Sequence, residues 1–138
     1  MAGNTILVAA IDFGTTFSGY AFSLRSDYEK DPTNISVNQN WVAGSMSLVS
    51  LKAPTCLLLD KSEELVAFGF AAEDKYTNLA LDGKHHDYYY FRRFKMLLHN
   101  NKTLSRTTTI EDDKGKTMLA MKVFSCRLVS SRSTYWTP

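Results

Sequence analysis

The strongest constraint on the fold is an apolar run near the start of the sequence that ends in a carboxylate. Residues 5–12 read TILVAAID, so every side chain between the first and the last is apolar. An apolar run of this length predicts a β-strand that is buried on both faces. It is too short for a signal peptide or a membrane span, so no membrane partner is expected. The strand would carry Asp12 to the point where the chain turns.

A turn that contains glycine and threonine follows this strand. Phe13-Gly14-Thr15-Thr16 leads into residues 17–24, FSGYAFSL, whose alternating side chains predict a second strand and therefore a β-hairpin. Glycine lets the backbone approach a ligand closely, and two threonines add hydroxyls beside exposed amides, so such a turn can hold phosphate oxygens. The Asp12 carboxylate can hold Mg²⁺ through its water ligands. A plain β-turn, in which Gly and Thr are common, explains the spacing equally well.

The rest of the chain is expected to alternate between short strands, loops and helices. Expected strands lie at 35–41, 55–60, 65–68 and 107–111, and expected helices at 69–78 and 117–128. Loops are expected at 25–34 and 83–87, a loop or edge strand at 42–54, and a turn at 112–116. Residues 88–99 are apolar, aromatic and basic, and they fit a helix or an extended segment equally well.

Composition excludes several classes of protein. Of 138 residues, 44% are hydrophobic and 22% are charged, which is typical of a globular domain rather than a disordered segment. The net charge of +2 is too small to require a nucleic-acid partner. Cys56 and Cys126 are too few for a disulfide scaffold and lack metal-ligand spacing, so both are predicted to be reduced thiols in a cytosolic protein.

Three other motifs could carry chemistry, but each has a simpler explanation. His85-His86-Asp87 could bind a metal, yet no second cluster completes a site, which favours an exposed loop. Residues 88–94 could stack single-stranded nucleic acid, but their aromatic side chains are contiguous rather than interleaved with charges, which favours a packed surface. Gly115-Lys116-Thr117 is similar to the end of a Walker A loop, but Ile110 stands where that motif needs its first glycine.

The hairpin sequence carries a family resemblance. Residues 8–22, VAAIDFGTTFSGYAF, resemble the first phosphate-binding hairpin of the actin, sugar-kinase and heat-shock ATPase superfamily. Within it the chain most resembles the 70 kDa heat-shock proteins, in their divergent type 12A/12B branch. Further segments that resemble this family follow in its order, at 52–59 (KAPTCLLL), 68–72 (FGFAA), 90–96 (YFRRFKM) and 107–128.

This resemblance implies an α/β, actin-like (ribonuclease H-like) ATPase fold, of which the chain holds an incomplete lobe I. Residues 1–129 would form a partial N-terminal lobe, and residues 130–138 an aberrant or truncated tail. A sheet that lacks most of its strands leaves an apolar face uncovered. The chain is therefore expected to be marginally stable or to depend on a partner.

The resemblance also implies a set of site residues, with ATP and Mg²⁺ as cofactors. Asp12 would hold the Mg²⁺ shell, and the Gly14-Thr15-Thr16 turn would wrap the β- and γ-phosphates. Lys95 would be the catalytic lysine, which orients the attacking water and neutralises charge on the γ-phosphoryl group. Arg92 and Arg93 lie in the same segment and are alternatives to Lys95.

The function implied is that of an ATP-binding, chaperone-like heat-shock ATPase fragment, located in the cytoplasm and inactive alone because most of its site is missing. The alternative is a non-catalytic interaction module that binds client proteins or co-chaperones. Residues 68–72 and 90–96 argue against another ATPase of the superfamily, such as a sugar kinase. A single-strand nucleic-acid binder is the least favoured interpretation, and its binding would depend steeply on salt.

Overall fold

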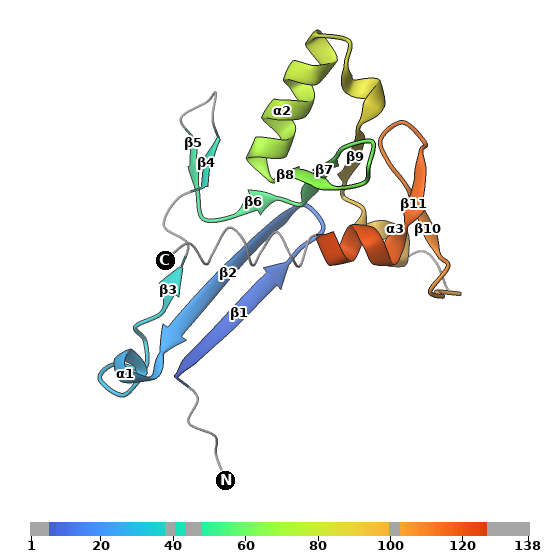
Figure 1. Cartoon of the computed structure of the whole chain (residues 1–138). Coiled ribbons are helices and arrows are strands. Elements are labelled where there is room, and N and C mark those ends of the chain that lie inside the picture. The colour runs from blue at the N-terminus through green and yellow to red at the C-terminus, as the bar shows by residue number, and fades with distance from the viewer. Residues whose placement is uncertain (1–5, 38–40, 44–47, 100–102, 127–138) are drawn as a thin grey trace.

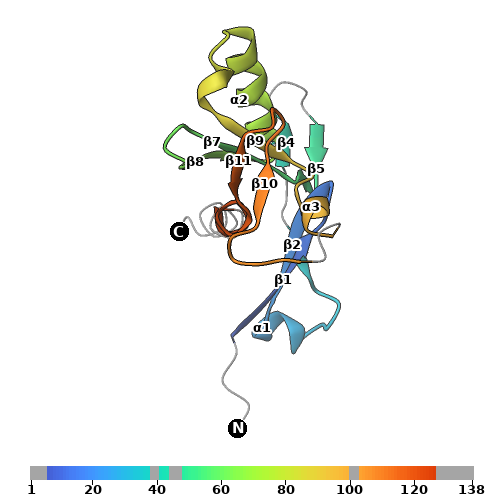
Figure 2. The same cartoon turned by 90° about the vertical axis from the view of Figure 1, so that its right-hand side faces the viewer.

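The computed structural model describes residues 6–37, 41–43, 48–99 and 103–126. These residues form a mixed α/β structure that is built from small antiparallel sheets and short helices (Figure 1). A long β-hairpin extends away from a more compact part, which contains the remaining sheets and the helix α2 (Figures 1 and 2). The candidate phosphate-binding turn lies where the hairpin meets this compact part.

The predicted hairpin is present. Strands β1 (Leu7–Phe13) and β2 (Phe17–Leu24) pair antiparallel, in a register that places Asp12 opposite Gly19. Two further strands extend this sheet from the other side of β2, namely β3 (Ser36–Val37) and β6 (Ala53–Pro54). The expected loop at 25–34 begins with one short helix, α1 (Arg25–Tyr28).

The prediction that the first strand is buried on both faces is wrong. Val8 is 64% exposed and Ile11 is 55% exposed, because β1 is an edge strand and no described strand or helix covers these side chains. Residues as apolar as these are usually covered by a second layer of structure. The uncovered apolar face that the sequence predicts for an incomplete sheet is therefore visible on this hairpin.

A second sheet contains most of the core. Strand β7 (Cys56–Leu59) is central and pairs antiparallel with β8 (Leu65–Phe68) and β9 (Tyr89–Arg92). Alternate side chains of β7 enter separate hydrophobic clusters, with Leu57 and Leu59 in one and Cys56 and Leu58 in the other. Since successive strand residues point to opposite faces, β7 is buried on both. The predicted strand at 55–60 and its partner at 65–68 are confirmed.

Helix α2 (Phe70–Leu81) confirms the predicted helix opened by a glycine. Gly69 precedes it with a φ of 63°, and a Cβ at this position would lie 2.9 Å from the Cβ of Ala53. A left-handed backbone without space for a side chain requires glycine. The chain can therefore turn from β8 directly into a helix that packs on β7.

The ambiguous segment 88–99 contains both predicted structures, since β9 is followed by the short helix α3 (Lys95–His99). The helix predicted at 117–128 begins later than expected. Residues 117–119 form strand β11 (Thr117–Leu119), which pairs with β10 (Thr109–Glu111), and residues 120–126 are helical. Ile110 lies opposite Met118 and both are buried, so strand pairing against the core prevails over the helical spacing of the methionines.

The remaining predictions fall partly outside the described residues. The expected strand at 35–41 corresponds to β3 and the start of β4 (Trp41–Ala43), and the segment 42–54 contains β5 (Leu48–Ser50) and β6. The segment 38–40, the end of the predicted helix and the tail 130–138 lie outside the described part. No helix in that part is both long enough and apolar enough to cross a membrane. No disulfide links the two cysteines, as predicted.

Candidate functional site

The hairpin turn presents backbone and side-chain donors that no described residue engages. The Gly14 N–H donates to the Phe17 carbonyl oxygen at 3.1 Å and closes the turn, and a Cβ on Gly14 would lie 2.3 Å from that oxygen. Only glycine fits so close an approach of the backbone to itself. Among the described residues, no hydrogen bond engages the amides or the hydroxyls of Thr15 and Thr16. The turn is therefore a small cradle with donors available to an anion.

Thr55 anchors this turn to the core sheet. Its hydroxyl donates to the Gly14 carbonyl oxygen at 2.8 Å, and its backbone N–H donates to the Thr16 carbonyl oxygen at 2.8 Å. Ser18 Oγ lies 2.8 Å from Thr55 Oγ1 and completes a buried network. Because Thr55 is only 2% exposed and immediately precedes β7, all four residues of which are buried, the turn is fixed to the core. The residues alone give no indication of this contact.

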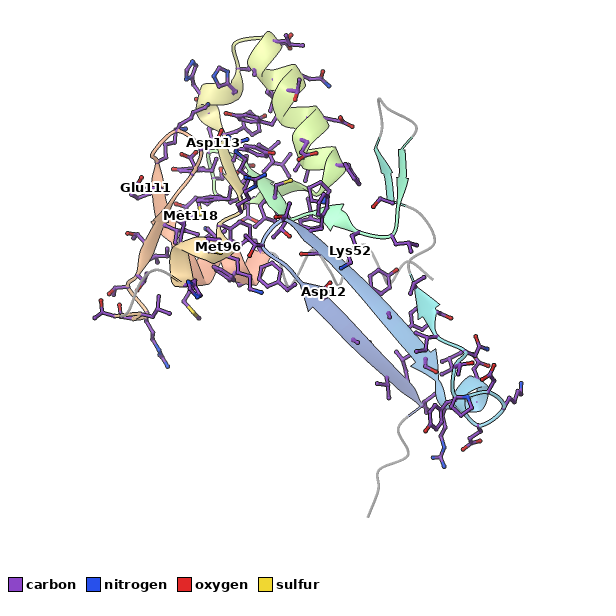
Figure 3. All side chains as sticks on the ribbon, turned by 180° about the vertical axis from the view of Figure 1, so that it is seen from behind. Asp12, Lys52, Met96, Glu111, Asp113 and Met118 are labelled. Carbon is purple, nitrogen blue, oxygen red and sulfur yellow. The ribbon has the colours of Figure 1, made fainter. Side chains whose placement is uncertain are left out.

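Asp12 stands at the end of β1 with an ion-pair partner that the sequence analysis does not predict. Lys52 Nζ lies 2.6 Å from Asp12 Oδ2, and Figure 3 shows the two side chains pointing toward one another. This hydrogen bond and the charge of Lys52 lower the pKa of Asp12, and Lys95 adds a smaller effect in the same direction. Asp12 is therefore a carboxylate at neutral pH, with a side chain that remains 56% exposed.

Lys95 reaches the same turn from α3. Its ammonium group donates to the Phe13 carbonyl oxygen at 2.5 Å and lies 5.3 Å from the centre of the Phe13 ring. Arg92 instead pairs with Asp113 at 2.6 Å. Arg93 has a φ of 51°, and its backbone N–H donates a hydrogen bond to the carbonyl oxygen of Thr55, the residue before β7. Of the basic residues in this segment, Lys95 is thus the one whose side chain is shown to contact the hairpin.

The structure therefore brings together the residues that the sequence analysis selects. Asp12, the 14–16 turn and Lys95 meet at one end of the hairpin, although Lys95 lies 82 positions beyond the carbonyl group that it contacts. The phosphate, metal and catalytic roles of these residues stay predictions. Lys52 and Thr55 are the neighbours that sequence reasoning misses.

The competing motifs have structural roles. His85–Asp87 forms a 3-10 helix, η1, rather than the expected loop, and no group of three or more metal-ligating side chains occurs in the described ranges. The backbone carbonyls of His85 and His86 accept hydrogen bonds from Lys114 and Lys116. The aromatic segment 88–94 is packed rather than free to stack bases. Its most buried members, at 6%, 0% and 0% exposure, are Tyr90, Phe91 and Phe94.

Comparison with known proteins identifies relatives over most of the chain. No protein-family model and no solved structure matches it. Heat shock 70 kDa protein 12B of Homo sapiens is 42% identical over 119 residues, which is 86% of this chain and 17% of that protein. Heat shock 70 kDa protein 12A is 36% identical in Mus musculus and 35% identical in Homo sapiens, over 123 residues, 89% of this chain and 18% of each relative. The chain thus spans less than a fifth of the length of these relatives, and over that span it is a homologue of the heat shock 70 kDa proteins 12A and 12B.

Proposed function

We propose that the β1–β2 hairpin binds the phosphates of Mg²⁺-ATP, as part of a cytoplasmic, actin-like ATPase region with a chaperone-like role in the stress response. The observation that carries the proposal is the convergence of Asp12, the 14–16 turn and Lys95 at one end of the hairpin. The homology to the heat shock 70 kDa proteins 12A and 12B supports it, because the resemblance to this family implies nucleotide and Mg²⁺ as ligands. The mixed α/β arrangement is compatible with part of such a lobe.

The residues present fit these ligands. An exposed carboxylate at the end of a strand suits a hydrated Mg²⁺ ion, which retains several of its waters. Gly14 lets the turn close on itself, because a Cβ there would meet the Phe17 carbonyl oxygen, and the amides of Thr15 and Thr16, which no described residue engages, suit phosphate oxygens. When bound, Mg²⁺ would neutralise charge on the phosphates. Asp12 would then hold the metal through water, and the turn would position the phosphate chain.

Lys95 would supply the remaining positive charge. Its ammonium group is fixed at the turn by one carbonyl oxygen, so it can stabilise charge that develops on a phosphoryl group and orient an attacking water. We propose that this chain alone binds nucleotide without appreciable turnover. The side chains of the site are still open to water, with Asp12 56% exposed, and electrostatic stabilisation is weak in a site that water enters.

The test is binding of a fluorescent ATP analogue to the 138-residue chain, with and without Mg²⁺. We expect Mg²⁺-dependent binding of the ATP and ADP analogues that Asp12→Asn weakens. Lys95→Met should weaken binding of the ATP analogue more than binding of the ADP analogue, because the role proposed for its charge is at the terminal phosphate. Lys84→Met is the matched control, since Lys84 is an exposed lysine that pairs with Asp82 just beyond α2. Absence of binding by the unaltered chain, or equal binding by all variants, would refute the proposal.

The second candidate is a non-catalytic module that binds client proteins or co-chaperones through the uncovered apolar face of β1. The exposure of Ile6 and Val8, at 71% and 64%, favours it, because side chains two positions apart in an extended chain lie on the same face. The variants distinguish the two candidates. If Asp12→Asn and Lys95→Met leave binding of a partner protein intact while Val8→Ser abolishes it, protein binding is the function of this chain.

A further inference from the structure

We propose that Lys52 is a built-in counter-cation for Asp12, which competes with a divalent metal ion for this carboxylate. The inference rests on the proposed function, because Asp12 is the metal-binding carboxylate of that site. It adds a residue to the site that controls how readily the metal is taken up. It follows from the route by which the Lys52 side chain reaches Asp12.

The backbone of Lys52 is placed by strand pairing. Lys52 stands between β5 and β6, and its neighbour Ala53 pairs with Ser18 of β2. The Lys52 N–H also donates to Ser50 Oγ at 3.2 Å. Its side chain therefore starts next to β6, on the far side of β2 from Asp12, and must cross β2 to reach β1.

Gly19 provides the path for this crossing. Gly19 lies directly opposite Asp12 in the hairpin register, and a Cβ on Gly19 would lie 3.3 Å from Lys52 Cγ. The aliphatic stem of Lys52 thus lies over Gly19, the residue of β2 that has no side chain to block it. The ammonium group then arrives 2.6 Å from Asp12 Oδ2. Two paired strands and the residue that leads into a third therefore build this contact, unlike a chance meeting of two surface side chains.

The two lysines at the turn have different partners. Lys95 donates to a backbone carbonyl oxygen, whereas Lys52 donates to the carboxylate itself. A hydrated divalent cation and the Lys52 ammonium group would compete for the same oxygen, so binding of one disfavours the other. Because the two side chains are 55% and 56% exposed, the ion pair is weak and opens readily. Exposed ion pairs of this kind change an equilibrium constant, here that for metal binding to Asp12, by about two- to five-fold.

The test uses Mn²⁺ alone as the probe, without nucleotide, on the 138-residue chain. Paramagnetic broadening of the amide NMR signals of residues 13–16 gives an apparent Mn²⁺ affinity. Lys52→Met keeps the stem over Gly19 and removes the charge, so we expect Mn²⁺ to bind about two- to five-fold more tightly. Lys52→Arg keeps the charge and should behave like the unaltered chain. Lys84→Met, which opens an exposed ion pair elsewhere, should also leave the affinity unchanged.

The outcomes separate this inference from the proposed function. Unchanged or weaker Mn²⁺ binding by Lys52→Met overturns the inference, as does equal tightening by Lys52→Arg, which would trace the effect to packing rather than charge. Broadening that persists in Asp12→Asn, or its absence from every variant, excludes Asp12 as a metal ligand and overturns the inference as well. Failure to bind an ATP analogue, with the Mn²⁺ result as expected, refutes only the proposed function.

Discussion

Thr55→Val tests how the candidate phosphate-binding turn is held to the core. Valine keeps the shape of the side chain but removes the hydroxyl that contacts Gly14 and Ser18. Thr55 is 2% exposed and Ser18 is 0% exposed, so water cannot replace the contact between their hydroxyls, whereas the Gly14 carbonyl oxygen is only partly buried. A buried partner that is left unpaired costs about 1–3 kcal/mol. With both partners affected, we expect the free energy of unfolding to fall by about 2–4 kcal/mol.

The measurement is urea unfolding followed by circular dichroism. Thr77→Val is the matched control, because the Thr77 hydroxyl also donates to a backbone carbonyl oxygen, that of Glu73, at 2.8 Å, but in an exposed position on α2. Threonine and valine have similar helix propensities. The control should therefore change the free energy of unfolding by no more than about 0.5 kcal/mol. A loss in Thr55→Val that does not exceed this control would refute the anchoring role.

A double substitution sharpens the test. Ser18→Ala removes the hydroxyl that Thr55→Val leaves unpaired, so the double variant should lose less stability than the sum of the single variants. Strict additivity would mean that the two hydroxyls do not interact. In that case the buried network at the turn would not explain the stability of the hairpin.

Three further predictions concern the core, a turn and the pH dependence. Leu58→Ala, at a fully buried position, should lower the free energy of unfolding by about 2–5 kcal/mol in the same urea assay. Gly69→Ala should cost about 1–3 kcal/mol more than Gly83→Ala, because both glycines have positive φ but only Gly69 lacks space. Lys52→Met should raise the pKa of Asp12 in an NMR titration. The pKa of Asp12 in the folded chain lies below its value in the unfolded chain. The stability that Asp12 contributes is therefore present above the unfolded pKa and is lost as pH falls through the folded pKa. Lys52→Met should lose less stability than the unaltered chain over this fall in pH.

Local sequence patterns predict those elements whose cause is local. The apolar run before Asp12 and the Gly14 turn specify the hairpin, and Gly69 marks the start of α2. The helix predicted at 117–128 shows where this reasoning fails. Met118 has helical spacing to later apolar residues, but it also lies opposite Ile110 across a tight turn, and burial of that pair determines the local structure. A contact between strands is not encoded in the period of either one.

The candidate site divides in the same way. Asp12 and the 14–16 turn are contiguous, so they can be found as a motif, and Lys95 is found through the family resemblance. Lys52 acts through one contact, at 2.6 Å, and Thr55 through several, at 2.8 Å, and all of them join residues about 40 positions apart. Nothing in the composition of the segment that contains them indicates a partner. They become recognisable only when β6 and β7 are placed beside the hairpin.

The hairpin is therefore supported at one end and exposed at the other. At the turn, the Phe13 ring lies 6.1 Å from that of Phe94 and 5.8 Å from that of Phe124, and Thr55 fixes the backbone. Toward its start, β1 presents exposed apolar side chains such as Val8. Local opening begins where few buried contacts oppose it, so the strands should separate from the exposed end first. The turn would stay in place while the exposed end opens, so substitutions should affect the proposed phosphate binding and the proposed partner binding separately.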